Sequence, residues 1–118
     1  MGNISGELRK TPTGLYTYDM EGDPILVFPL ATLIQKKFGL EAGKFPAIGL
    51  DEVLVELTYN NIPIIVGWDI WSDLFVMAMD QRANFKVKEI AEYLSTKLIK
   101  LGKLEDKLLA EQKKKEEK

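Results

Sequence analysis

The alternation of apolar and polar residues predicts a strand near the start of the chain. Between Leu15 and Met20, apolar and polar side chains follow one another with a period of two, which is the period of a β-strand with one buried face. Residues 21–24 are predicted to form a turn. Gly22 can adopt a wide range of φ angles, and the proline at position 24 restricts its own φ to a narrow range. We therefore expect Ile25–Phe28 to return as a second strand.

A helix is predicted next, from Pro29 to Phe38. Apolar residues recur at intervals of three and four in this segment, proline suits the first turn of a helix, and Gly39 is a typical C-terminal stop. An alternative interpretation starts the helix at Pro24 with Asp23 as its cap. It places Pro29 in a helix interior, where proline is disfavoured.

A hairpin gives the clearest pattern in the chain. Residues 41–50 are predicted to be a loop, because glycine and proline punctuate them. Val53–Thr58 then alternates as a strand, and Ile62–Trp68 runs back as another. Between them, Asn60 and Asn61 suit a two-residue turn, since asparagine tolerates positive φ.

The remaining pattern predicts one more strand and one long helix. Residues 69–73 form a turn, and Leu74–Met79 is apolar on both faces, as expected of a central strand. From Phe85 to Leu101 apolar residues recur at helical spacing, with Asn84 as a candidate cap. Beyond Gly102 the apolar stripe thins, which predicts fraying helix or disorder.

Together these elements predict an α+β fold in the order β-β-α-β-β-β-α. We expect an antiparallel sheet of about four to five strands with the helices packed on one face. Residues 1–101 are predicted to form a single domain, and residues 102–118 a charged C-terminal tail, helical or disordered. The 118-residue chain is 46% hydrophobic and 29% charged, which is typical of a globular domain.

The chain contains no cysteine and no histidine. This composition excludes disulfides, metal sites built on thiolates or imidazoles, and cysteine or serine–histidine nucleophiles. We expect no cofactor, no bound metal and no catalytic residue. Because the first residues lack the apolar core of a signal peptide and no run is long enough to cross a membrane, we expect a cytoplasmic protein with no membrane partner.

Charge is distributed unevenly along the chain. Residues 19–80 carry ten acidic and three basic side chains, for −7, whereas residues 81–118 carry eleven basic and seven acidic ones, for +4. Nucleic-acid binding depends on neutralising phosphates with lysine and arginine. The acidic middle of the chain therefore argues against a nucleic-acid partner and favours a basic protein partner.

The turn between the last two predicted strands is the most informative segment for function. Trp71 stands there between Asp69 and Asp73, and a tryptophan in a polar turn is a typical interface anchor. We predict that these three residues face a protein partner, and that Glu56 helps to steer association. The alternative is that Trp71 closes the bottom of the core.

Two other classes of function are compatible with the sequence. Asp69, Asp73 and Asp80 could form a small carboxylate-based catalytic or metal-binding site. Aspartate is also a common turn residue, however, and no phosphate loop or nucleophile elbow accompanies these three. The third class is an assembly subunit that dimerises through an uncovered sheet face or the C-terminal helix, so both monomer and homodimer stay open.

The segment Gly67–Asp73, the strand after it and the closing helix resemble the hairpin region of small α+β immunity proteins. Those proteins are encoded beside bacterial polymorphic or contact-dependent toxins, and the resemblance covers about residues 14–100. It implies a bacterial cytoplasmic protein whose partner is a cognate toxin domain, often a basic nuclease. Such a protein neutralises the toxin by covering its active or substrate-binding surface.

Overall fold

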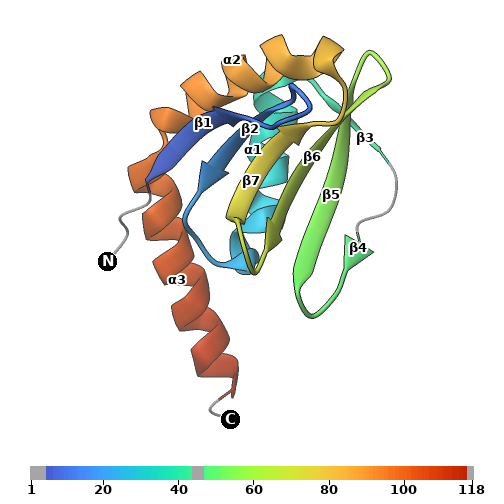
Figure 1. Ribbon diagram of the computed structural model, residues 1–118. Helices are drawn as coiled ribbons and strands as arrows, with labels where there is room; N and C mark the ends of the chain where they lie inside the picture. Colours follow the sequence, from blue (N-terminus) through green and yellow to red (C-terminus); the bar gives the residue numbers. More distant parts are fainter. Residues whose placement is uncertain (1–4, 44–46, 117–118) are drawn as a thin grey trace.

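Seven strands form one antiparallel sheet in the computed structural model, which describes residues 5–43 and 47–116 (Figure 1). The strands are β1 (Gly6–Lys10), β2 (Tyr16–Met20), β3 (Glu41–Ala42), β4 (Ala47–Ile48), β5 (Glu52–Tyr59), β6 (Ile62–Asp69) and β7 (Asp73–Ala78). The helices are α1 (Val27–Phe38), α2 (Asn84–Ser95) and α3 (Leu98–Glu116), and the 3-10 turns η1 (Pro24–Leu26) and η2 (Gln81–Ala83) lead into α1 and α2.

The strand order is β1-β2-β7-β6-β5-β3, with β4 also paired to β5. Strand β7 lies between β2 and β6, so its predicted central place is confirmed. The turn joining β5 to β6 has Asn60 at φ 49° and Asn61 at φ 66°, which is the pair of positive angles that a tight two-residue hairpin requires. The expectation of an α+β fold with an antiparallel sheet is therefore correct.

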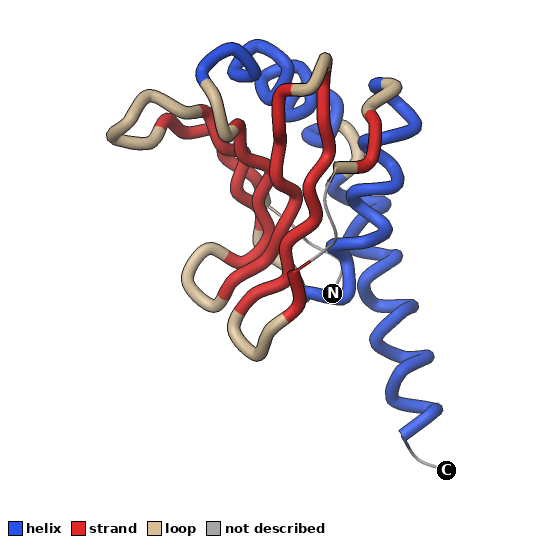
Figure 2. Tube along the Cα trace, turned by 90° about the vertical axis from the view of Figure 1, so that its right-hand side faces the viewer, coloured by secondary structure: helices blue, strands red, loops and turns tan. Residues whose placement is uncertain are grey.

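The core lies between the sheet and the helices α1 and α2, which cover the same face (Figures 1 and 2). Alternate residues of the central strands point into it, among them Tyr18, Val66 and Val76, which lie in register across β2, β7 and β6. Helix α3 packs against η1 and then extends beyond the end of the sheet (Figure 1).

The prediction of a strand at Ile25–Phe28 is wrong. Oδ1 of Asp23 accepts the N–H of Ile25 at 2.9 Å and caps η1, and α1 starts directly afterwards at Val27. The alternative start at Pro24 with an Asp23 cap is thus the better interpretation. Proline is tolerated at 29 because it falls in the first turn of α1, where the backbone N–H would have no intrahelical partner.

The sheet also has more strands than the predicted four to five. Strand β1 precedes all the predicted strands, and β3 and β4 lie within the segment 41–50 that was expected to be a loop. Residues 44–46 of that segment are outside the described part of the chain. Every residue of β1, β3 and β4 is exposed, so these strands have no buried face and no apolar alternation. They are recognised only by their backbone pairing with neighbouring strands.

The long helix predicted from Phe85 to Leu101 is interrupted. Helix α2 ends at Ser95, and a new helix, α3, starts at Leu98 and continues as far as Glu116. Asn84 does not cap α2 as expected; its side chain instead accepts the N–H of Tyr16 and donates to the carbonyl of Gly14, both at 2.9 Å. Residues 102–116 of the predicted tail are therefore helical in the structure.

Candidate functional site

The face of the sheet opposite α1 and α2 is not covered by a helix among the described residues (Figure 2). We call it the open face. Its side chains alternate with those of the core, and register places them in rows across the strands. One row is Leu54, Gly67, Phe75 and Asp19; the next is Glu56, Ile65, Met77 and Thr17.

The centre of the open face is apolar. Phe75 is only 7% exposed although no helix covers it, and its neighbour across the strand is Gly67. A Cβ atom at Gly67 would come within 2.9 Å of Phe75 Cζ and 2.7 Å of Leu54 Cδ2. The glycine therefore lets these two side chains meet and shield each other, with Ile65 and Met77 half-buried beside them.

Carboxylates surround this apolar centre. Strand alternation and register direct the following acidic side chains to the open face: Glu7, Asp19, Glu41, Glu52, Glu56, Asp69 and Asp73. Arg9 is the basic side chain that joins them, and it forms an ion pair with Asp19. Most lysines lie instead in α1, α2 and α3, so the sheet side of the molecule is acidic and the helical side is basic.

The β6–β7 turn stands at one end of the open face and carries three of the predicted site residues. Oδ1 of Asp69 accepts the N–H of Trp71 at 2.9 Å and that of Ser72 at 2.6 Å. Asp73 closes the turn with φ at 57°, a left-handed conformation that aspartate tolerates better than most residues. Trp71 itself is 82% exposed, so it does not close the bottom of the core.

A second loop brings further apolar side chains next to this turn. The N–H of Ile70 donates to the carbonyl of Asp51 at 3.2 Å, which ties the β6–β7 turn to the β4–β5 loop. Leu50 on that loop is 99% exposed, and Ile48 and Ile70 are also exposed. We call Ile48, Leu50, Ile70 and Trp71 the loop-end cluster. Exposed apolar residues on β4 and on two loops that a hydrogen bond joins are typical of an interaction site.

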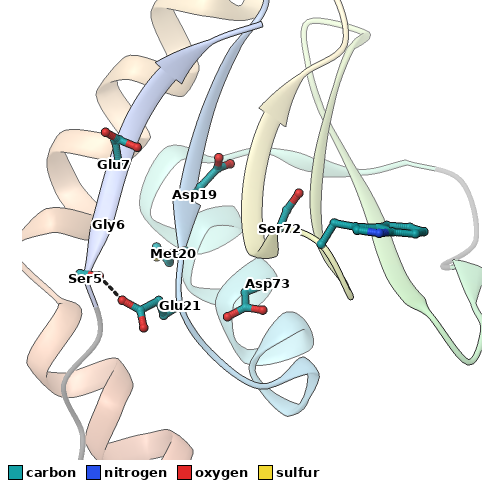
Figure 3. A pocket seen from close by; sticks show the side chains of 9 residues that line it. Ser5, Gly6, Glu7, Asp19, Met20, Glu21, Ser72 and Asp73 are labelled. Atoms are coloured by element: carbon teal, nitrogen blue, oxygen red, sulfur yellow. Dashed lines mark hydrogen bonds between the residues drawn. The ribbon is translucent and has the colours of Figure 1, made fainter.

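Beside Trp71 lies a pocket of about 500 Å³ (Figure 3). Strands β1 and β2 and the β6–β7 turn form its walls, and its lining includes the carboxylates of Glu7, Asp19, Glu21 and Asp73. Ser5 donates a hydrogen bond to Glu21, and Thr17 donates one to Asp19 at 2.8 Å. The pocket holds acidic groups and no lysine or arginine, so it suits a basic side chain of a partner.

The structure brings together Asp69, Trp71 and Asp73 but not Glu56. Glu56 lies on the same face, four residues along β5 from Glu52, which pairs with Asp69; at the usual strand rise this is roughly 13 Å away. Ile48, Leu50 and Ile70 were not predicted. No periodic pattern distinguishes these three residues, because apolar residues next to turns are ordinarily interpreted as part of the core.

The alternative carboxylate site is not assembled. Asp80 lies beyond the far end of β7, roughly 20 Å from Asp73 by strand rise. It caps η2 and pairs with Arg82, which holds the pKa of the Asp80 carboxyl below its usual range. Within the described residues, no group of three or more acidic side chains is placed to hold a metal ion.

None of the helices in residues 5–43 and 47–116 is both long enough and apolar enough to cross a membrane. Comparison with protein-family models, with curated proteins and with solved structures gives no match for this chain.

Proposed function

We propose that this protein binds a basic protein partner through the loop-end cluster and the acidic open face beside it, and that it is not an enzyme. The observation that supports this most strongly is Trp71, which is 82% exposed on a turn that its own hydrogen bonds hold in place. Exposing a large aromatic side chain to water is unfavourable. A tryptophan on a hydrogen-bonded turn with other exposed apolar residues nearby is a typical interface anchor.

Charge supports the choice of partner. The carboxylates of the open face give it a negative potential, which speeds association with a positively charged surface. The apolar centre formed by Leu54, Ile65, Phe75 and Met77 offers area that a partner can bury once it has docked. Tryptophan and the apolar centre would then slow dissociation, while the acidic rim would mainly set the rate of encounter.

We further propose that the partner is a cognate bacterial toxin domain and that this protein acts as a cytoplasmic immunity protein. A nuclease must carry a basic surface to hold its phosphate-rich substrate. An acidic protein that covers this surface blocks the substrate without any chemistry of its own. The resemblance of Gly67–Asp73 and the following strand to immunity proteins supports the same role.

The test begins with capture of proteins from a lysate of the native host on the immobilised full chain. Trp71→Ala is run beside it, together with Ile99→Ala, a matched control because Ile99 is a large apolar residue, 70% exposed, on α3. We expect a basic protein to be retained by the wild type and by Ile99→Ala and lost with Trp71→Ala.

The captured protein is then produced alone and together with this chain in a growing culture. An immunity protein must relieve the growth inhibition that the partner causes. If the partner is not inhibitory, the immunity role is wrong while partner binding stands. If Trp71→Ala retains the same proteins as the wild type, the proposed binding surface is wrong.

A further inference from the structure

Strand β1 is an edge of the sheet with a defined set of outward-facing backbone groups. All five of its residues are exposed, and its partner within the described chain is β2 alone. The carbonyl of Ser5 accepts the N–H of Glu21, and the N–H of Thr11 donates to Leu15. Because N–H and C=O groups alternate in direction along a strand, Glu7 and Arg9 also face β2.

The same alternation directs the N–H and C=O groups of Gly6, Leu8 and Lys10 away from the sheet. The register agrees, since Ser5 and Thr11 continue the pairing that runs from Gly6 opposite Met20 to Lys10 opposite Tyr16. A row of exposed, unpaired backbone groups of this kind is the usual template for adding another strand.

We propose that β1 pairs antiparallel with β1 of a second copy of the chain, about a two-fold axis through Leu8. In this register Leu8 lies opposite Leu8 of the second copy, and Gly6 lies opposite Lys10. The outward N–H and C=O of each of these residues then form hydrogen bonds with the second copy. The exposed backbone groups of the edge gain partners without any change within the sheet.

Charge selects both the second copy and the register. The two-fold places Glu7 of each copy directly opposite Arg9 of the other, on the side of the open face, where Arg9 also keeps its ion pair with Asp19 of its own chain. Each Glu7–Arg9 pair is a non-hydrogen-bonded pair of the new ladder, and in such pairs the two side chains approach most closely. A shift that centres the axis on Lys10 would instead put two lysines opposite each other. The strand is thus complementary to itself in one register.

The pairing leaves the β6–β7 turn free and engages Glu7 among the carboxylates that line the pocket beside Trp71. A two-fold axis between antiparallel strands is perpendicular to the sheet, so the open faces of both copies lie on the same side of one continuous sheet. Trp71 and Asp73 stay away from the new junction, because β2 separates β1 from β7. The dimer therefore goes beyond the proposed function and does not depend on it.

The test is the mass of the full chain in solution, measured by light scattering over a concentration series. We expect the mass to rise from monomer to dimer. Leu8→Pro removes the central outward N–H, which has no partner among the described residues of the monomer, and should stay monomeric at all concentrations. Leu8→Val keeps that N–H and should dimerise as the wild type does. Circular dichroism and melting establish that each variant is folded.

Charge exchange gives a second arm that does not depend on proline. Glu7→Arg alone places like charges opposite each other at two positions, and so does Arg9→Glu, so each variant should raise the dimer dissociation constant at least about tenfold. A mixture of the two variants restores opposite charges at both positions. We expect the mixture to form a heterodimer, and the double variant Glu7→Arg/Arg9→Glu to form a homodimer.

A wild-type protein that stays monomeric at every concentration overturns the proposal. So does a dimer that Leu8→Pro leaves intact, or a dimer that the mixture of charge variants does not restore. In the last two cases another surface of the chain forms the contact. If Leu8→Pro does not fold, the result of the charge variants decides.

Discussion

The backbone N–H of Trp71 lies 2.9 Å from Oδ1 of Asp69, and the same oxygen also accepts the N–H of Ser72. One carboxylate oxygen of Asp69 is thus engaged with its own turn. That Asp69 also faces a partner stays a prediction. The carboxylate fixes the turn that presents the indole, while Asp73 lines the acidic pocket next to it.

Two substitutions of Asp69 should distinguish the effect of its hydrogen-bond acceptor from the effect of its charge. Asp69→Asn keeps an oxygen acceptor, so the turn and its affinity for a partner should be largely retained. Asp69→Ala leaves two backbone N–H groups without their acceptor and should lower the free energy of unfolding by about 1 kcal/mol, and weaken partner binding with it. Urea unfolding and binding measured on both variants check this. Equal losses for Asn and Ala would show that charge matters and geometry does not.

Neutralising the acidic rim should act on the rate of association. Asp73→Asn is suited to this test, because asparagine also tolerates the left-handed conformation at position 73. Asp73→Asn and Glu56→Gln should each slow association with the basic partner. They should also weaken the dependence of the association rate on salt concentration, and the dissociation rate should change little. Stopped-flow association at several salt concentrations measures both effects.

Glu92→Gln is the control for the rim variants. Glu92 is an exposed carboxylate on α2, on the side of the molecule opposite the open face. If its removal slows association as much as Asp73→Asn does, net charge and not the open face steers the encounter.

Truncation after Leu101 should destabilise the fold, because α3 is part of the packing. Leu104 and Leu108 pack against the core, and a carboxylate oxygen of Glu105 accepts the N–H of Asp23 at 2.7 Å. Losing two half-buried leucines should lower the free energy of unfolding by about 2 kcal/mol, and the melting temperature by about 10 °C.

A chain that ends at Ala110 is the matched truncation. Residues 111–115, which this truncation removes, are exposed and are charged except for the polar Gln112. The melting temperature should therefore stay within about 2 °C of that of the full chain. Equal melting temperatures for the two truncations would mean that the contacts of α3 with η1 contribute nothing to stability.

Stability at high pH should depend on Tyr18. Burial raises the pKa of the Tyr18 hydroxyl above its usual value, because the charged form is poorly solvated. A folded-state pKa above the unfolded one means that this contribution is fully present below about pH 10 and is lost as the pH rises through the folded pKa. The free energy of unfolding should therefore fall more steeply above about pH 10 in the wild type than in Tyr18→Phe.

Urea unfolding from about pH 8 to about pH 11.5 gives the two curves, a range that spans the ordinary tyrosine pKa. Tyr93→Phe controls for the loss of a hydroxyl elsewhere, on α2. Parallel curves for the wild type and Tyr18→Phe would contradict the role of Tyr18.

The parts of the fold that follow from local pattern were predictable. Strands β2 and β5 have apolar alternation, β6 and β7 are short apolar runs, and the Asn60–Asn61 turn has the residue type that its positive φ angles need. Leu26 and Val27 show why the second strand was misread. They are adjacent and both fully buried, and a short run of buried residues does not distinguish a strand from the start of a helix.

The remaining elements depend on strand pairing and tertiary contacts, which no local sequence pattern shows. Strand β1 has one apolar residue, Leu8, and is defined by its bonds to β2, so no period reveals it. The break between α2 and α3 is hidden because Leu94, Leu98 and Leu101 keep helical spacing across it. Within the site, Trp71 stood out by its polar neighbours, whereas Leu50 joins it through a bond between two distant loops.

The most direct measurement of the central claim is to follow unfolding and partner binding on the same Trp71→Ala protein. With the indole 82% exposed, the free energy of unfolding should change by less than about 0.5 kcal/mol, while binding of the basic partner should weaken by about 2 kcal/mol or more. A Trp71→Ala protein that unfolds much more readily, yet binds with wild-type affinity while folded, would contradict the account.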